Sequence, residues 1–215
     1  MTLYTYYRSS CSYRVRIALA LKELEFEPHY VHLLRSGGQN WKPDYLQQNP
    51  QGLVPTLADG QRVLTQSLAI IEYLDEAYPE PPLLPEDARD RAYVRALAQI
   101  IACDIQPLNN LRVLDYLKRV FTANEQQTLA WYRHWLSEGL RTVESLLSSH
   151  EQANSCCCYS DALTLADISL IPQVYSAKRF HCDLEPFARV RKIYECCTAL
   201  PAFQAAAPEN QGDAE

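Results

Sequence analysis

A proline-rich segment divides this sequence into two parts with different patterns. Four prolines fall within seven residues, at positions 79, 81, 82 and 85. Because proline cannot continue a helix and has a fixed backbone angle, the segment predicts a stiff, extended connector. We therefore predict two domains, over residues 1–78 and 87–215, joined by a linker at residues 79–86.

The part before the prolines predicts a small α/β domain. Its strand-like runs are short, and Asp59-Gly60 is a strong signal for a hairpin turn. Ser67 stands where an N-cap would begin the last helix. The predicted elements, in the order βαβαββα, cover residues 3–6, 9–22, 27–33, 43–48, 54–57, 62–64 and 68–75. This order is thioredoxin-like and packs helices on one small mixed sheet.

The part after the prolines predicts an all-α domain. Apolar side chains recur at helical spacing in two long stretches, residues 87–119 and 124–149. Thr164 and Asp167 form a capping-box pattern at the start of another helix, in which Pro172 should produce a kink. Two further helix starts are marked by Pro186 and Pro201.

Charge and hydropathy argue against nucleic-acid binding and against a membrane-spanning segment. The chain has 215 residues and a formal net charge of −6, which argues against nucleic acid as a partner, because phosphate binding needs a basic surface. No apolar run approaches the roughly 20 residues that span a bilayer, and the first residues lack the pattern of a signal peptide. We therefore expect a cytoplasmic protein with no membrane contact.

The eight cysteines predict neither a disulfide framework nor a metal site. The chain is long, and the contiguous runs at 156–158 and 196–197 lack the C-x-x-C spacing of a zinc site. We expect reduced thiols and no bound metal. The run of Cys156, Cys157 and Cys158 should be sensitive to oxidation.

A strand-to-helix turn at residues 8–12 is the strongest functional signal. Ser9, Ser10 and Cys11 place two hydroxyls and a thiol where a helix begins. Since a helix N-terminus has unpaired N–H groups and a partial positive charge, the turn predicts a site for an ionised sulfur. That sulfur belongs either to Cys11 or to a bound thiol. The alternative is that Ser9 or Ser10 only caps the helix.

Two further segments favour a bound anion or peptide. Pro55 removes a backbone donor at the start of a strand, and a cis Val54-Pro55 bond would turn the Val54 backbone toward an extended ligand. An ordinary proline at a strand edge is the alternative. Gln66-Ser67 begins a helix, where Ser67 either caps the helix or holds a ligand carboxylate.

Together these segments resemble a known family. Residues 9–19 read SSCSYRVRIAL, which is similar to the SSCxxRVRIAL signature of the zeta-class glutathione transferases, the maleylacetoacetate isomerases. The resemblance continues in unbroken order through residues 49–50, 54–55, 66–74, 105–107 with 110, 172–174, 200–203 and 208–211. It implies a thioredoxin-like glutathione domain, a helical domain and a homodimer.

The resemblance also implies roles for single residues. Ser9 would assist the glutathione thiolate, with Ser10 and Cys11 beside it as the other catalytic candidates. Asn40 stands where many members have glutamine, which implies a shorter or water-mediated contact. Glutathione binding is implied for Ser9, Asn40, Val54, Pro55, Gln66, Ser67, Gln106 and Asn110.

The activity that the resemblance implies is the isomerisation of maleylacetoacetate to fumarylacetoacetate, in tyrosine and phenylalanine breakdown. A thiolate can add to the cis double bond, allow rotation and leave again, so glutathione would act as a cofactor. The substrate is a dicarboxylate, and the planar fork of arginine suits carboxylates. Arg8, Arg112 and Arg179 are the implied substrate-binding residues. For each, a solvated surface charge is the alternative.

Three other interpretations stay open. A maleylpyruvate isomerase of gentisate degradation would run the same chemistry on a shorter diacid. A general transferase of the zeta class would conjugate glutathione or dehalogenate small α-haloacids with the same thiolate. A non-enzymatic binding protein of this fold is disfavoured, because the thiolate turn, the glutathione contacts and the arginines occur together.

Overall fold

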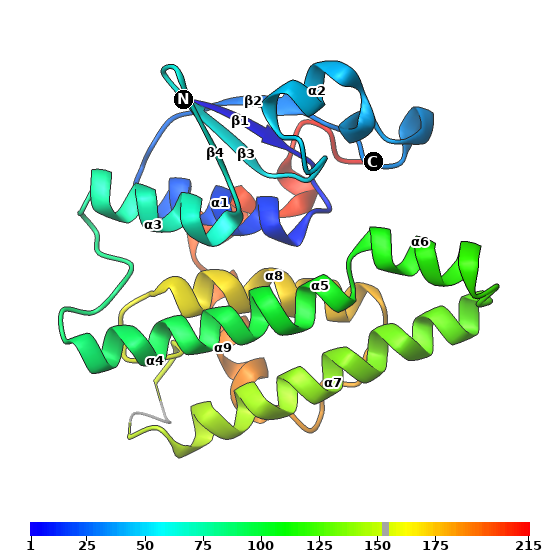
Figure 1. The fold of residues 1–215 in the computed structure, drawn as a ribbon. Coiled ribbons are helices and arrows are strands. Elements are labelled where there is room, and N and C mark those ends of the chain that lie inside the picture. The colour runs from blue at the N-terminus through cyan, green and yellow to red at the C-terminus, as the bar shows by residue number, and fades with distance from the viewer. Residues whose placement is uncertain (152–154) are drawn as a thin grey trace. The chain divides into compact units, whose positions relative to one another are not determined.

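The computed structural model describes residues 1–151 and 155–215. These residues fall into two compact units, which are residues 1–82 together with 199–215, and residues 83–198. In Figure 1 the first unit holds the blue and cyan ribbons and the red C-terminal segment. The sequence-based division put residues 199–215 with the helical domain, whereas their contacts lie in the first unit.

A four-stranded mixed sheet organises the first unit. Its strands are β1 (Thr2–Thr5), β2 (Glu27–Tyr30), β3 (Thr56–Asp59) and β4 (Arg62–Thr65). The strand order is β2-β1-β3-β4, with β1 parallel to β2 and antiparallel to β3, and β3 antiparallel to β4. The predicted hairpin turn forms at Gly60, where φ is 58°. The predicted thioredoxin-like order βαβαββα is confirmed.

Three helices cover this sheet. They are α1 (Ser10–Leu21), α2 (Pro43–Gln48) and α3 (Ser67–Ala77). Helices α1 and α3 lie side by side on one face, and α2 lies on the other (Figure 1). Leu3 of β1, Leu57 of β3 and Ile70 of α3 are fully buried between sheet and helices. Short turns η1 (Arg35–Gly37) and η2 (Gln39–Trp41) precede α2.

The C-terminal segment belongs to this unit because α1 binds it directly. The buried Arg16 donates from Nε to the carbonyl of Ala206 over 3.0 Å and from Nη2 to the carbonyl of Tyr7 over 3.1 Å. The Tyr13 hydroxyl donates to the carbonyl of Phe203 over 3.2 Å. The contacted helix is α10 (Pro201–Ala206), followed by the turn η4 (Pro208–Asn210).

The proline-rich segment is held at both ends. Lys22 Nζ pairs with Asp75 Oδ1 at 3.0 Å and donates to the carbonyls of Tyr78 and Pro81 over 2.6 Å and 2.9 Å. Between Pro82 and Pro85, the carbonyl of Leu83 accepts from the N–H of Leu165 over 2.9 Å, inside the second unit. The connector is therefore tied into each unit by its own hydrogen bonds.

Within the described part of the second unit, residues 83–198, the regular secondary structure is helical, as predicted. Its helices are α4 (Ala88–Gln99), α5 (Gln106–Leu108), α6 (Leu111–Val120), α7 (Glu125–Ser149), α8 (Leu165–Arg179) and α9 (Ala188–Thr198). Helix α8 packs against α4 and α9, and most of its residues are buried. None of the helices in the described residues has an apolar stretch long enough to cross a membrane.

The stretch with helical spacing at residues 87–119 forms several helical elements and not one continuous helix. After α4 the chain forms a π-helical turn, η3 (Ile100–Ile105), and leaves helical geometry at Asn109. Asn109 Nδ2 donates to the carbonyl of Tyr132 over 3.2 Å, and the side chain of Asn110 caps α6. These two amide side chains stop one helix and start the next.

The other helix starts agree with their sequence signals. Asn124 and Gln127 form a capping box at the start of α7. Thr164 and Asp167 form the predicted capping box at the start of α8, and Pro172 lies inside that helix. The fully buried Asp167 carboxylate accepts from the N–H groups of Thr164 and Cys158, each over 2.8 Å.

Candidate active site

The register of the sheet brings three predicted segments to one edge. Tyr4 of β1 pairs with Thr56 of β3, and Thr56 pairs with Thr65 of β4. Residues 8–11 follow β1, residues 54–55 precede β3, and residues 66–67 follow β4. All three segments therefore lie at the same end of the sheet, within the first unit.

Ser9 is the N-cap of α1. Its Oγ accepts from the N–H of Ser12 over 3.2 Å, and its backbone is extended, with φ −75° and ψ 116°. This bond uses a lone pair of the hydroxyl oxygen and leaves the hydroxyl hydrogen to donate elsewhere. The capping role and a role as donor to an ionised sulfur are therefore compatible in one side chain.

Ser10 and Cys11 form the first turn of α1, where both are partly exposed. Arg14, one turn later, is 1% exposed, so its charge lies beneath this turn. Its Nη1 lies 3.8 Å from Cys11 Sγ and 3.4 Å from Ser67 Oγ, and it donates to both. A buried guanidinium thus joins the N-terminus of α1 to that of α3.

Ser67 is not the N-cap of α3, contrary to the prediction. Gln66 holds that position with φ 70° and ψ 114°, and its side chain makes no capping bond. Instead Gln66 Nε2 donates to Gln51 Oε1 over 2.8 Å at the surface. Ser67 is the first helical residue, and its hydroxyl oxygen accepts from Arg14. The first N–H groups of α3 are therefore not capped by either side chain.

The peptide bond Val54-Pro55 is cis. The preceding carbonyl of Leu53 is held by the Tyr45 hydroxyl and by Asn49 Nδ2, the latter over 2.8 Å. By contrast, the N–H and the carbonyl of Val54 make no hydrogen bond with any residue that the structure describes. Val54 thus offers one donor and one acceptor at the sheet edge, as an added extended strand would need.

Asn40 lies behind this segment. It is 6% exposed, and its Nδ2 donates to the carbonyl of Gly52 over 2.8 Å. Gly52 has φ 62°, and a Cβ there would come within 2.5 Å of the Trp41 ring, so only glycine suits this turn. The geometry favours a supporting role, in which Asn40 fixes the turn that leads to Val54.

Arg8 is exposed and its guanidinium lies over the Tyr7 ring, 4.9 Å from the centroid. The N–H of Tyr7 donates to Asp213 Oδ2 over 3.0 Å. The C-terminal segment therefore anchors the backbone one residue before Arg8. No local sequence signal marks Asp213, because its partner is 206 positions away.

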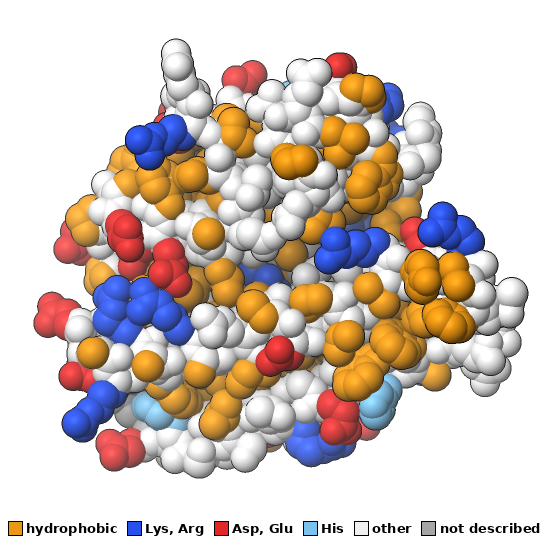
Figure 2. All heavy atoms as spheres, viewed as in Figure 1, with side chains coloured by type: hydrophobic (Ala, Val, Ile, Leu, Met, Phe, Trp, Pro, Cys, Tyr) orange, Lys and Arg blue, Asp and Glu red, His pale blue; other side chains and the backbone are white. Residues whose placement is uncertain are grey.

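The remaining predicted residues belong to the second unit. Gln106 begins α5 and is half-buried, and Asn110 Oδ1 accepts from the N–H of Arg112 over 3.1 Å. Arg112 is exposed and borders a surface hollow of about 570 Å³ beside Tyr116 and Arg119. Hydrophobic and basic side chains gather over α6 in Figure 2, and the exposed apolar ones are Leu111, Tyr116, Val120 and Phe121.

Tyr132 of α7 joins the two regions of this unit that carry predicted residues. Its carbonyl accepts from Asn109, the neighbour of Asn110. Its ring lies 4.2 Å from that of Phe180, the neighbour of Arg179, whose guanidinium also covers Phe180. Burial raises the pKa of Tyr132 above its ordinary value. One residue that the sequence did not single out therefore contacts the ends of both α5 and α8, through its carbonyl and its ring respectively.

Comparison with known proteins places this geometry in a family. The family described as "Glutathione S-transferase, N-terminal domain" matches residues 3–82. A probable maleylacetoacetate isomerase of Vibrio cholerae is 47% identical over 214 residues, which cover 100% of this chain and 98% of that protein. A solved maleylpyruvate isomerase, described as a bacterial zeta-class glutathione transferase, superposes with a TM-score of 0.97 at 46% identity over 100% of both chains.

This chain belongs to the zeta-class glutathione transferases. A further member, the maleylacetoacetate isomerase of Methylobacterium extorquens AM1, was solved with bound malonate and glutathione. It matches with a TM-score of 0.95 at 39% identity over 100% of both chains. The resemblance carried by residues 9–19 is thereby confirmed over the full length.

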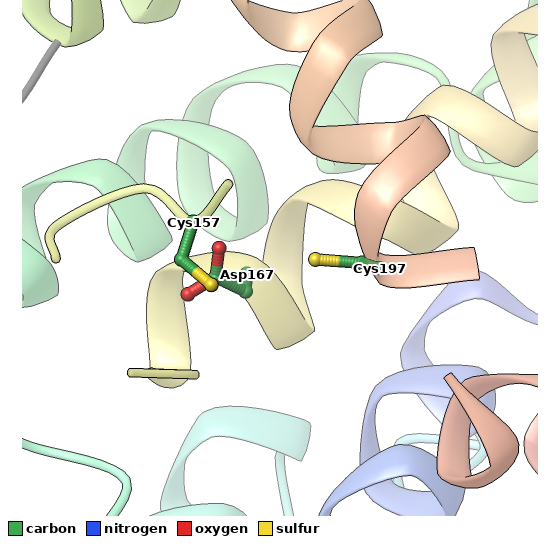
Figure 3. A group of neighbouring side chains, drawn as sticks. All are labelled: Cys157, Asp167 and Cys197. Atoms are coloured by element: carbon green, nitrogen blue, oxygen red, sulfur yellow. The ribbon is translucent and has the colours of Figure 1, made fainter. Parts of the chain in front are cut away.

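One group outside the zeta-class site has metal-ligating side chains. Cys157, Asp167 and Cys197 offer ligand atoms that lie within 4.8 Å of one another, and all three are buried (Figure 3). From the sequence we expected no such group among the cysteines, because their spacing does not resemble that of a zinc site. However, Asp167 already accepts from two N–H groups and from the Thr164 hydroxyl over 2.9 Å. Its carboxylate acts as the cap of α8.

Proposed function

We propose that this zeta-class chain is a glutathione-dependent cis–trans isomerase that converts maleylacetoacetate to fumarylacetoacetate. The observation that carries the proposal is the open main chain of Val54, at the same sheet edge as the N-termini of α1 and α3. Full-length similarity to a probable maleylacetoacetate isomerase supports the substrate. A place in tyrosine and phenylalanine breakdown, a cytoplasmic location and a homodimer are parts of the same proposal.

The first unit fits glutathione, which is an extended tripeptide with two carboxylates and one thiol. The N–H and carbonyl of Val54 would pair with its central main chain, beside the turn at Pro55. Gln66 and the uncapped N–H groups at Ser67 would hold the γ-glutamyl carboxylate, since a helix N-terminus favours an anion. Asn40 would support this arrangement through Gly52.

Ser9 would stabilise the ionised sulfur. Its hydroxyl hydrogen is not used by the cap, so it can donate to a thiolate at the start of α1. Ser10 and Cys11 lie in the same turn, where the partial positive charge of the helix acts on a bound anion. When bound, glutathione supplies a thiolate that adds reversibly to the conjugated cis double bond of the substrate and is released unchanged.

The dicarboxylate substrate needs cations. We assign its carboxylates to Arg8, Arg112 and Arg179, all of which have exposed side chains. Gln106 and Asn110 of the second unit are assigned to glutathione binding. Asn110 uses only Oδ1 for its cap, so its Nδ2 can donate to a ligand. The relative solved with bound malonate and glutathione supports the binding of a small dicarboxylate together with the cofactor.

A second candidate is maleylpyruvate isomerisation, favoured by the TM-score of 0.97 to a solved maleylpyruvate isomerase. Steady-state turnover of both diacids with catalytic glutathione distinguishes the two. The proposal expects a higher kcat/KM for maleylacetoacetate. A higher kcat/KM for maleylpyruvate would support the second candidate. Conversion of either compound only with consumption of glutathione would indicate a conjugating transferase.

A further inference from the structure

The second unit brings two contiguous cysteine runs against each other. The segment before α8 carries Cys156 and Cys157, and the last turn of α9 carries Cys196 and Cys197. The Cys196 thiol donates to Cys156 Sγ, with the two sulfurs 2.6 Å apart. Cys156 is exposed and Cys196 is partly exposed, whereas Cys157 and Cys197 are buried.

Hydrogen bonds on both sides hold the 155–158 segment against α9. Arg189 of α9 donates from Nη1 to the carbonyl of Ser155 over 3.1 Å. The Ser155 hydroxyl donates to the carbonyl of Cys157 over 2.7 Å, and the N–H of Cys158 donates to Asp167 over 2.8 Å. The approach of Cys156 to Cys196 is therefore built into the backbone arrangement.

A metal site explains this cluster less well. Two thiolates on one tetrahedral zinc lie roughly 3.8 Å apart, given Zn–S bonds of about 2.3 Å. The Cys156–Cys196 separation of 2.6 Å is much shorter. Cys157 and Cys197 form a buried inner pair, and Asp167 lies close to them. The lone pairs of the Asp167 carboxylate are already used by its capping bonds and by the Cys158 thiol. Sulfurs this close are placed for a bond of about 2.05 Å to each other.

We infer that Cys156 and Cys196 are a modification site, at which exchange with a small disulfide such as glutathione disulfide forms a reversible protein disulfide. The Cys156 thiolate attacks one sulfur of glutathione disulfide, so that a mixed disulfide forms and one glutathione thiolate leaves. The Cys196 sulfur, after losing its proton to solvent, then attacks the Cys156 sulfur and expels the second glutathione. Two protein thiols are oxidised and one small disulfide is reduced to two thiols.

The outer pair differs from the inner pair in access. Cys156 faces solvent, so an oxidant or a reductant reaches it directly, which favours a labile bond. Cys157 and Cys197 are buried, and their mutual hydrogen bond together with burial raises the pKa of Cys197. They are expected to stay as thiols. The new bond would link the segment before α8 to the end of α9.

The test oxidises the full-length protein in a glutathione disulfide buffer, then labels all remaining thiols under denaturing conditions. Intact mass should show two fewer labels than in the reduced protein, and peptide fragmentation should assign the cross-link to Cys156 and Cys196. The oxidised protein should also melt roughly 5–10 °C above the reduced one, because the bond restricts the unfolded chain.

Variants make the test specific. Cys156→Ser and Cys196→Ser should each abolish both the cross-link and the rise in Tm. Cys103→Ser, which removes an exposed cysteine elsewhere in the same unit, should retain both. The inference is overturned if all eight thiols remain free after oxidation, if the cross-link joins another pair, if the Tm does not rise, or if stoichiometric zinc is found on these thiols. None of these readouts depends on the isomerase activity.

Discussion

Arg14 Nη1 lies 3.4 Å from Ser67 Oγ and joins the start of α3 to the start of α1. The same atom contacts Cys11 Sγ at 3.8 Å. The N-termini of both helices lie at the end of the sheet where we propose that glutathione binds. A single buried guanidinium therefore fixes the distance between the predicted thiolate turn and the predicted carboxylate site.

Arg14→Lys tests this connection. Lysine keeps the charge but loses the planar guanidinium, whose Nη1 contacts both Ser67 Oγ and Cys11 Sγ. We expect KM for glutathione to rise about tenfold, the effect of one lost hydrogen bond, with a smaller change in kcat. Arg141→Lys is the control, since Arg141 is exposed and pairs with Glu138 at the surface. An unchanged KM in Arg14→Lys would contradict the role assigned to Arg14.

Asp213→Ala tests the anchor of the turn. The substitution leaves the N–H of Tyr7 without its acceptor, which should lower the free energy of unfolding by about 1–2 kcal/mol. Because Arg8 follows Tyr7, KM for the dicarboxylate substrate should rise as well. Urea unfolding and steady-state kinetics measure the two effects. The exposed Asp161 provides the control Asp161→Ala, and equal stability of the two variants would refute the anchor.

Alkaline pH should weaken the fold between about pH 10 and pH 12. Burial raises the pKa of Tyr6 to about 12 and that of Tyr93 to about 12. In the unfolded chain tyrosine ionises near pH 10, so in this window the folded state binds more protons. The free energy of unfolding therefore falls as the pH rises.

Tyr93→Phe isolates one of these contributions. Phenylalanine cannot ionise, so unfolding of the variant should release up to one proton fewer between about pH 10 and about pH 12. The unfolding free energy should therefore decrease less steeply with pH in this range. The variant also loses the hydrogen bond of Tyr93 to the carbonyl of Leu146 and should be less stable near pH 7. Tyr116→Phe, at an exposed position, should match the native protein. Equal slopes for Tyr93→Phe and the native chain would be inconsistent with this explanation.

Gly139→Ala tests the close approach of α7 to the π-helical turn η3. A Cβ at Gly139 would lie 2.1 Å from Cγ1 of Ile105. We expect a loss of about 1–3 kcal/mol in the free energy of unfolding from this overlap. Ile105→Ala should relieve it, so the double variant should lose less than the sum of the two single losses. Additive losses would show that the two side chains do not meet.

Elements that depend on local sequence were predicted well. The order βαβαββα, a serine cap at Ser9 or Ser10 (the structure has Ser9) and the capping box of Thr164 with Asp167 follow from signals a few residues apart. The zeta-class resemblance followed from the contiguous run at residues 9–19. In each of these features the interacting residues are only a few positions apart, so a short stretch of sequence contains all the residues that determine it.

Features that depend on distant partners were missed. The docking of residues 199–215 on the first unit rests on Arg16 and Ala206, which are 190 positions apart. The break at Asn109 depends on a carbonyl of α7. Gln66 adopts a positive φ, which is unusual for glutamine and could not be predicted from the sequence. As a result Gln66, and not Ser67, is the N-cap residue of α3. Tertiary contacts decide each of these positions.

Ser9 substitutions separate catalysis from capping. Ser9→Ala should lower kcat/KM on the order of 10²–10³, because a donor to the thiolate is lost. Glycine is a nearly neutral N-cap, so Ser9→Gly keeps the helix start but should show the same loss. Ser9→Thr retains both the hydroxyl and the cap and should keep most activity. Near-native kinetics for Ser9→Gly would assign Ser9 to capping alone.

The number of maleylacetoacetate molecules converted per glutathione shows whether glutathione acts as a cofactor or is consumed. The protein is mixed with a large excess of maleylacetoacetate over glutathione, and fumarylacetoacetate and free glutathione are both measured over time. We expect many turnovers per glutathione, with the glutathione concentration unchanged at the end. Conversion that stops after one equivalent, or that proceeds equally without glutathione, would rule out glutathione as a cofactor of the isomerisation.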